Sequence, residues 1–290
     1  MRHAKLQDLE LDLLLHGIAE RYGYDFRRYA RSSLKRRVAH RMAESGVDTV
    51  SELLARMLRD EELFAAFLHD MSINVTAMFR NPPFYRALRE AVVPFLRELP
   101  VVKVWHAGCA TGQEAFSMAI LLHEAGCLDR CRLYATDYNS ISLATAEDGI
   151  LPLHHLRGYA TNYYRSGGLA PFSSYVHAQY GRARISSFLR RSIKFSHHNL
   201  VRDRSFLTAD LILCRNVLIY FDAKLQLQTL DLFASSLAPG GFLCLGSREM
   251  LGAPLSQRGF TTVDSSLRIF RKNNADSPQH DYPAIGESAR

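Results

Sequence analysis

The sequence predicts a doubly wound α/β sheet that is preceded by an all-helical domain and interrupted by a small antiparallel β-subdomain. Three observations lead to this fold class. Apolar residues recur at helical spacing up to about residue 75. From about residue 100, short apolar strands alternate with amphipathic helices, which is typical of a parallel sheet. Between residues 151 and 192 this alternation stops, and aromatic, β-branched and turn-forming residues take its place.

These changes of pattern define the expected domain boundaries. Residues 1–75 are predicted to form the helical domain, and residues 76–272 the α/β domain, into which residues 151–192 are inserted. Residues 273–290 are polar and are expected to form a disordered tail.

The helical domain is predicted to be a small bundle. Its first helix carries four apolar residues near helical spacing: Leu6, Leu9, Leu13 and Ile18. Thr49, followed three residues later by Glu52, fits a capping box that opens a further helix. Another apolar stripe lies between residues 63 and 71.

One segment of this domain is strongly basic. Its cations are Arg27, Arg28, Arg31, Lys35, Arg36, Arg37 and Arg41. Leu34, Val38 and Met42 supply an apolar face, so the segment is predicted to be an amphipathic helix with one basic side. A merely solvated face is the alternative. Because no acidic residue lies between Phe26 and Ala43, we expect docking onto a negatively charged partner.

The α/β domain is expected to begin with a strand over 101–107 and a helix over 115–122. A second strand over 132–136 and a helix over 140–147 follow. Further strands are predicted at 210–214, 242–246 and 267–271, with a helix over 224–237 that Pro239-Gly240-Gly241 closes.

The composition limits the classes of protein. The chain has 290 residues, of which 47% are hydrophobic, and a net charge of +7. Residues 149–202 contain eight cations and no acidic residue. Nucleic acid, an anionic membrane and an acidic protein are all compatible with this excess. The five cysteines form no CxxC pair, so we expect a reduced, cytoplasmic protein without structural zinc. No apolar run reaches the roughly 18 residues of a membrane span.

The segment 104–114 predicts a ligand site at the end of the first strand. Gly108 and Gly112 allow a ligand to approach the backbone, but the segment is neither a GxGxxG fingerprint nor a phosphate loop. Asp137, at the end of the second strand, can accept hydrogen bonds from both hydroxyls of a ribose. An adenosine ligand without pyrophosphate fits these features, and S-adenosylmethionine is such a ligand. An ordinary turn with a capping Asp is the alternative.

Two further segments carry polar residues at expected ligand positions. Arg215, Asn216 and Tyr220 follow the buried strand 210–214, at the sheet edge where ligands bind. The alternative for Arg215 is a strand-end Arg that pairs with a local acid. The segment 74–81 lies at the junction of the helical and α/β regions, and such junctions are favoured ligand sites.

Taken together, these segments resemble the chemotaxis receptor methyltransferase family, CheR. The matching strings, in family order, are Thr-Ala-Met-Phe-Arg at 76–80, Trp-His-Ala-Gly-Cys-Ala-Thr-Gly-Gln-Glu at 105–114, Ala-Thr-Asp at 135–137, His-Asn-Leu at 198–200, Cys-Arg-Asn-Val-Leu-Ile-Tyr-Phe at 214–221 and Leu-Ala-Pro-Gly-Gly-Phe-Leu-Cys-Leu-Gly at 237–246. The resemblance implies a class I methyltransferase fold. It also implies methyl transfer from S-adenosylmethionine to receptor glutamates, which leaves S-adenosylhomocysteine and needs no metal.

The resemblance also implies roles for individual residues. Cofactor contacts would fall on Asn74, Thr76, Arg80, Gly108, Gly112, Glu114, Asp137, Asn199, Leu200, Arg215 and Asn216. Arg80 and Tyr220 would lie beside the reacting centre. The basic helix would dock on the methylation helices in the cytoplasmic domain of the receptor. The inserted β-subdomain resembles one that binds a receptor C-terminal peptide in some members, although it diverges most from the family pattern. A monomer is expected.

Three alternatives remain. Asn81-Pro82-Pro83-Phe84 resembles a motif of adenine methyltransferases, but it precedes the glycine turn, so a proline-rich helix start is expected and no nucleic-acid partner. Methylation of another protein and a non-catalytic S-adenosylmethionine-binding module are the other two.

The pairs His154-His155 and His197-His198 lack further ligands at a convincing spacing, so no metal site is expected.

Overall fold

The computed structural model describes residues 2–71, 76–179, 181–249 and 255–274. The predicted disordered tail lies outside these residues from position 275 onward. By its internal contacts the chain divides into two compact units. One comprises Met1–Ile73 together with Ile219–Gln226, and the other comprises Asn74–Leu218 together with Leu227–Arg290. Each unit is described by itself.

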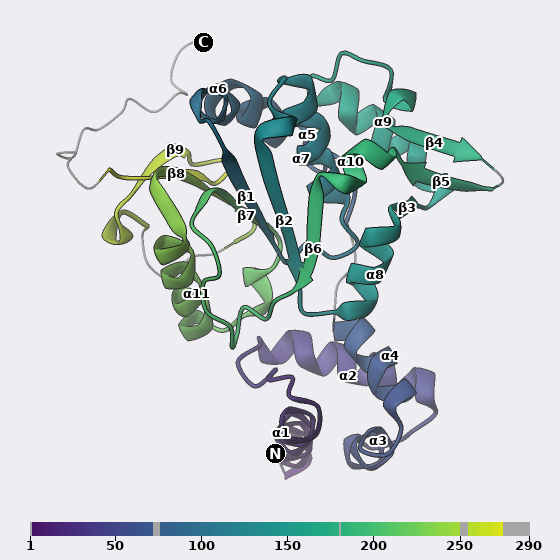
Figure 1. Ribbon diagram of the computed structural model, residues 1–290. Helices are drawn as coiled ribbons and strands as arrows, with labels where there is room; N and C mark the ends of the chain where they lie inside the picture. Colours follow the sequence, from purple (N-terminus) through teal and green to yellow (C-terminus); the bar gives the residue numbers. More distant parts are fainter. Residues whose placement is uncertain (1, 72–75, 180, 250–254, 275–290) are drawn as a thin grey trace, which may run out of the picture. The chain divides into compact units, whose positions relative to one another are not determined.

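The helical unit contains four helices in its N-terminal part (Figure 1). They are α1 (Arg2–Tyr22), α2 (Arg31–Ser45), α3 (Val50–Met57) and α4 (Glu61–Met71). The capping interaction predicted at the start of α3 is confirmed, because the Glu52 backbone N–H donates to Thr49 Oγ1 at 3.1 Å. The apolar face predicted for α2 is confirmed at Leu34 and Val38, which are both buried.

The helix predicted at α1 is confirmed, but of its predicted apolar stripe only Ile18 is buried. Leu6, Leu9 and Leu13 are about half exposed, at 51%, 55% and 51%. The buried face of α1 is carried instead by Leu11, Leu14, Leu15 and Ile18. Both stripes have helical spacing, and only the packing of α1 against its neighbours selects between them.

The second unit is built on a seven-stranded sheet with the order β6-β2-β1-β7-β8-β10-β9. The strands are β1 (Val102–Ala107), β2 (Cys131–Asp137), β6 (Ile193–His197), β7 (Ala209–Cys214), β8 (Leu237–Leu245), β9 (Phe260–Asp264) and β10 (Ile269–Lys272). The strands β6, β2, β1, β7 and β8 run parallel to one another. Strand β10 runs antiparallel to both of its neighbours, β8 and β9. The predicted doubly wound α/β class is therefore confirmed, with a mixed sheet rather than a purely parallel one.

The helices of this unit largely follow the predicted alternation. They are α5 (Pro82–Ala87), a single π-helical turn (Leu88–Val92), α6 (Val93–Glu98), α7 (Gln113–Glu124), α8 (Ser140–Asp148) and α11 (Ala223–Ser236), the last beginning in the other unit. Short 3₁₀ turns lie at Leu128–Arg130, Leu218–Tyr220 and Leu255–Arg258. Pro82 opens α5, as expected for a proline-rich helix start. Pro239-Gly240-Gly241 lies inside β8 and does not separate α11 from the strand, contrary to the prediction.

The insertion is only partly a β-subdomain. Its three-stranded antiparallel sheet has the order β3-β5-β4, formed by β3 (Ile150–Leu151), β4 (Val176–Gln179) and β5 (Arg182–Ile185). The remaining elements are α9 (Leu156–Arg165), α10 (Ser187–Arg191) and the 3₁₀ turns Leu153–His155 and Phe172–Ser174. The sequence did not predict α9. Its buried residues, Tyr159 and Tyr163, are aromatic and also suit strands.

Candidate functional site

The predicted glycine turn connects β1 to α7. The backbone N–H groups of Gly108 and Cys109 both donate to Thr136 O, at 2.8 and 2.9 Å, which ties the turn to the end of β2. Gly108 has φ +76°, and a Cβ there would lie 2.5 Å from Val217 Cγ2. Gly112 has φ +89°. Glycine is therefore required at both positions by backbone angle, and at Gly108 also by close packing.

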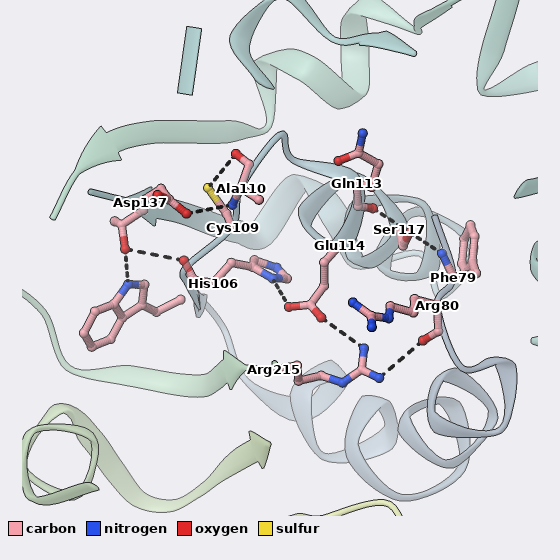
Figure 2. A network of polar contacts seen from close by, with 12 residues as sticks. Phe79, Arg80, His106, Cys109, Ala110, Gln113, Glu114, Ser117, Asp137 and Arg215 are labelled. Atoms are coloured by element: carbon pink, nitrogen blue, oxygen red, sulfur yellow. Dashed lines mark hydrogen bonds and ion pairs between the residues drawn. The ribbon is translucent and has the colours of Figure 1, made fainter. Parts of the chain in front are cut away.

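Asp137 holds the other side of this turn. Its side chain is buried, and its oxygens accept backbone hydrogen bonds from Ala110 at 2.9 Å, which Figure 2 shows, and from Asn139 at 3.0 Å. Burial raises the pKa of Asp137, and these backbone donors counteract it only in part. A carboxylate has about four acceptor sites, so the backbone donors at Ala110, Tyr138 and Asn139 do not exhaust it.

Glu114 lies in the first turn of α7 between two positively charged or titratable side chains. Its carboxylate contacts His106 Nδ1 at 3.4 Å and accepts from Arg215 Nη1 at 3.0 Å (Figure 2). Burial alone would raise the pKa of Glu114, but the His106 contact and the Arg215 charge outweigh it, so the pKa is lowered. Glu114 is therefore an anion at neutral pH.

Arg215 is buried at the end of β7, with its side chain only 5% exposed. Besides the ion pair with Glu114, its guanidinium lies 3.9 Å from the centroid of the Phe84 ring and donates through Nη2 to Arg80 O at 3.3 Å. The structure thus has the Arg–acid pair that the sequence left as an alternative. The acid is separated from Arg215 by 101 positions. The pair connects β7, α7 and the segment before α5.

The segment that carries Arg80 is fixed against α7. The Phe79 N–H donates to Ser117 Oγ at 2.8 Å, and that hydroxyl donates to Gln113 O at 2.7 Å (Figure 2). Phe79 and Asn81, on either side of Arg80, have φ +51° and +65°. Such angles are strained for residues other than glycine and are held by the surrounding contacts. The Arg80 side chain is exposed. Thr76 is half-buried, and Asn74 lies outside the described residues.

The predicted contacts beyond β6 and β7 flank the same sheet edge. The His198 N–H donates to Asp137 O at 3.1 Å, which ties the segment after β6 to the end of β2, and the next residues, Asn199 and Leu200, are half-buried. Asn199 Oδ1 accepts from the Val201 N–H at 2.9 Å, so its amide shapes its own loop. Asn216 has φ +64°. A Cβ on Gly246 would lie 2.8 Å from the backbone nitrogen of Asn216, so the two segments are closely packed.

Tyr220 is placed differently from the other predicted residues. It belongs to the helical unit through the segment Ile219–Gln226. In that unit its ring lies under the Arg37 guanidinium, which is 4.7 Å from the ring centroid.

Although no acid lies between Phe26 and Ala43 in the sequence, most cations of the basic segment pair with acids from other parts of the helical unit. Arg27 pairs with Asp25, Arg28 with Asp222, Arg31 with Asp8 and Asp12, Lys35 with Asp8, and Arg41 with Asp70. Arg37 is buried. Arg36 is exposed. Most of the acids come from α1, α4 and the segment that contains Tyr220, so folding of the unit brings them to α2.

Two residues of the network were missed by the sequence reasoning. His106 is fully buried in β1, and its Nε2 finds no hydrogen-bond partner in the part of the chain that the structure describes. A polar residue inside an apolar strand was the available signal. Ser117 lies three positions after Glu114 on α7, and its role depends on the distant Phe79, which no local pattern indicates.

Two negative findings concern the described residues only. Among them, no group of three or more His, Cys, Asp or Glu side chains could hold a metal ion. No helix that they form is long and apolar enough to cross a membrane.

Comparison with known proteins assigns both parts of the chain to one family. The family model "CheR methyltransferase, SAM binding domain" matches residues 74–267, and "CheR methyltransferase, all-alpha domain" matches residues 9–72. The chain is 44% identical over 266 residues to the Pseudomonas putida protein Cher3, covering 92% of this chain and 97% of that protein. It is 30% identical over 268 residues to a chemotaxis protein methyltransferase of Listeria innocua, covering 91% and 99%. The corresponding protein of Vibrio anguillarum is 31% identical over 231 residues, covering 75% and 80%.

Proposed function

Because the chain belongs to the CheR methyltransferase family, we propose that it methylates glutamate side chains of methyl-accepting chemotaxis receptors. The methyl donor would be S-adenosylmethionine, and the products would be a glutamate methyl ester and S-adenosylhomocysteine. One observation carries the proposal: the strings that match the family converge on one sheet edge, where Asp137 accepts from the glycine turn and Glu114 pairs with His106 and Arg215. The cytoplasm is the proposed compartment, because that is where the signalling domains of such receptors lie.

The residues at this edge suit the proposed donor. S-adenosylmethionine supplies a methyl group on a sulfonium, which is already activated for transfer. Asp137 presents a buried carboxylate at the end of β2, the position from which an acid accepts a hydrogen bond from a ribose hydroxyl in α/β nucleotide sites. Glu114 is anionic at neutral pH and pairs with Arg215, and its carboxylate has further acceptor sites for an ammonium group of the ligand. Because Gly108 and Gly112 have no side chains, the ligand can approach the backbone of this turn closely.

The chemistry requires positioning more than proton transfer. A substrate glutamate has an ordinary pKa of about 4.3, so its carboxylate is a nucleophile at pH 7 without a general base. The exposed Arg80 is suited to hold one carboxylate oxygen by a charge-assisted hydrogen bond. Contact with both oxygens would reduce their nucleophilicity. Alignment of the other oxygen with the donor methyl then supplies the rate increase. Tyr220 would orient the carboxylate rather than deprotonate it.

The insertion supports a second contact with the receptor. A cavity of about 630 Å³ is lined by Arg182, Arg184, Arg190, His177, Ser174, Ser186, Ser187, Ile150, Ile185 and Phe188. Arg182 and Arg184 alternate with the buried Ala183 and Ile185, so both project from the outer face of β5. Three guanidinium groups beside an apolar wall are complementary to an acidic peptide with apolar side chains. A receptor C-terminal segment of that composition is the proposed occupant.

The deciding experiment is transfer of a radiolabelled methyl group to membranes that carry candidate receptors. We expect base-labile label on glutamate, released as methanol, and loss of label when the acceptor glutamates are replaced by alanine. Label on lysine, on a soluble protein or on nucleic acid would contradict the proposal and favour another methyltransferase. Tight S-adenosylmethionine binding without transfer to any acceptor would favour a non-catalytic module.

A further inference from the structure

Arg37 does not belong to the exposed face of α2. Its neighbours Lys35 and Arg36 are exposed, whereas Arg37 is only 4% exposed. Its Nη1 donates to Met71 O at the end of α4, at 2.5 Å. Burying a guanidinium is costly, so its position needs a reason beyond docking on an external partner.

The face of the guanidinium covers the ring of Tyr220. The distance from Arg37 Cζ to the ring centroid is 4.7 Å, within the range of a cation–π contact. A planar guanidinium can stack on an aromatic ring while its edge donates hydrogen bonds, which an ammonium cannot do. The bond to Met71 O fixes the guanidinium, and the guanidinium in turn limits the orientations of the ring.

The backbone on both sides of Tyr220 is attached to the same helical segment. The Ala30 N–H donates to Tyr220 O at 2.8 Å, and the Asp222 N–H donates to Arg28 O at 2.8 Å. The Arg28 side chain binds Asp222 through two hydrogen bonds of 2.6 and 3.0 Å. These bonds hold the main chain, whereas the Arg37 guanidinium contacts the face of the ring itself.

We propose that Arg37 is a positioning residue that orients the Tyr220 ring for methyl transfer, rather than a receptor-docking residue. The inference rests on the proposed function, in which Tyr220 lies beside the reacting centre. Arg28 has the corresponding role for the main chain of the same segment. Docking is thereby left to the exposed cations of α2, of which Arg36 is the clearest.

The test separates turnover from receptor affinity. In Arg37→Lys, the charge remains but the stacking is lost, so kcat should fall about tenfold while KM for the receptor changes less than twofold. Arg36→Ala should instead raise that KM at unchanged kcat. Arg59→Lys, an exposed change just after the end of α3, is the matched control and should alter neither. Rates are normalised to the fraction of protein that binds S-adenosylmethionine, so that partial unfolding does not affect kcat.

A second variant and a double variant complete the kinetic test. Arg37→Gln keeps a donor for Met71 O without the charge, and should also lower kcat at unchanged KM. When Tyr220→Leu has already removed the ring, adding Arg37→Lys should lower kcat little further. A rise in KM with unchanged kcat, or full additivity of the two substitutions, would overturn the positioning role.

A spectroscopic readout makes the inference independent of the substrate. In the chain labelled with ¹³C-tyrosine, the Tyr220 resonance is assigned from its absence in Tyr220→Phe. Arg37→Lys should shift or broaden this resonance, and an unchanged resonance would overturn the inference. An inactive unsubstituted chain would instead contradict the proposed function alone.

Discussion

Arg80 lies between two residues with left-handed backbone angles, Phe79 and Asn81, and the hydrogen bond from Phe79 to Ser117 holds that turn in place. Such strain is maintained only where the surrounding contacts determine the conformation. The cost is consistent with a side chain that must project in one direction. Under the proposed function, this turn sets the direction in which Arg80 projects.

Replacing Arg80 by alanine tests this role. We expect kcat for receptor methylation to fall about 10–100-fold, because the acceptor carboxylate is no longer held in line. The melting temperature should stay within about 2 °C, since the Arg80 side chain is exposed. Arg86→Ala, on the exposed side of α5, is the control. Normal turnover in Arg80→Ala would exclude the steering role.

The ion pair between Glu114 and Arg215 predicts a dependence of stability on pH. A lowered pKa in the folded state means that Glu114 stabilises the fold above its ordinary pKa of about 4.3. This stabilisation is lost as the pH falls through the folded-state pKa. Glu114→Gln should lower the free energy of unfolding at pH 7 by about 1–3 kcal/mol and flatten its fall below pH ~4.3.

Denaturant unfolding between pH 7 and pH 3 measures this difference. Glu98→Gln, at the exposed end of α6, is the control for loss of a carboxylate. Parallel curves for Glu114→Gln and the unsubstituted chain would show that the pair does not contribute.

Single residues show where sequence reasoning stopped. Asp137 and the glycines could be predicted, because a strand end and a turn are local features. The partners of the cations could not: Arg215 and Glu114 are 101 positions apart, and Arg28 and Asp222 are 194 apart. An acid-free stretch of sequence therefore says little about the charge of the surface that it forms.

At the scale of elements, the turns before and after α7 each contain a glycine with a left-handed backbone angle. Gly108 and Gly126 have similar φ angles, +76° and +71°. A Cβ at Gly108 would lie 2.5 Å from Val217 Cγ2, whereas one at Gly126 would meet no atom of the described residues within 4 Å. Gly126→Ala should cost about 1–2 kcal/mol for the backbone angle alone. Gly108→Ala should cost about 1–3 kcal/mol more, because the methyl group overlaps Val217.

Thermal and chemical unfolding of both variants checks this prediction. S-adenosylmethionine affinity should fall only in Gly108→Ala. Equal losses of stability in the two variants would show that the contact with Val217 relaxes without cost.

Strand β6 was missed and the buried face of α1 was misassigned, each for its own physical reason. Strand β6 reads Ile-Lys-Phe-Ser-His, and its burial is partial, so it lacks the apolar run of the central strands. The stripe of α1 was assigned to the wrong face because Leu6, Leu9 and Leu13 have the same period as the buried leucines. Periodicity identifies a helix, but neighbouring elements decide which face is buried.

At the scale of the whole molecule, the basic insertion predicts an electrostatic contact. Arg184→Glu should weaken binding of an acidic receptor C-terminal peptide about 10–100-fold, because it replaces a positive charge of the cavity lining by a negative charge that repels the peptide. Arg157→Glu makes the same change of charge on α9, within the same acid-free block but away from the cavity lining. Calorimetric titration with the peptide at two salt concentrations measures both. Equal weakening by the two substitutions would indicate a general charge effect rather than a site.

The segment Ile219–Gln226 has a consequence for exchanging parts between relatives. It is encoded far from the N-terminal helices, yet it packs with them: Phe221 and Leu225 are 5% and 1% exposed, and Arg28 binds Asp222. A chimera that replaces only residues 1–73 would place foreign side chains against this segment. A workable graft must therefore carry two pieces of sequence, and natural recombination within this family would be constrained at the same two places.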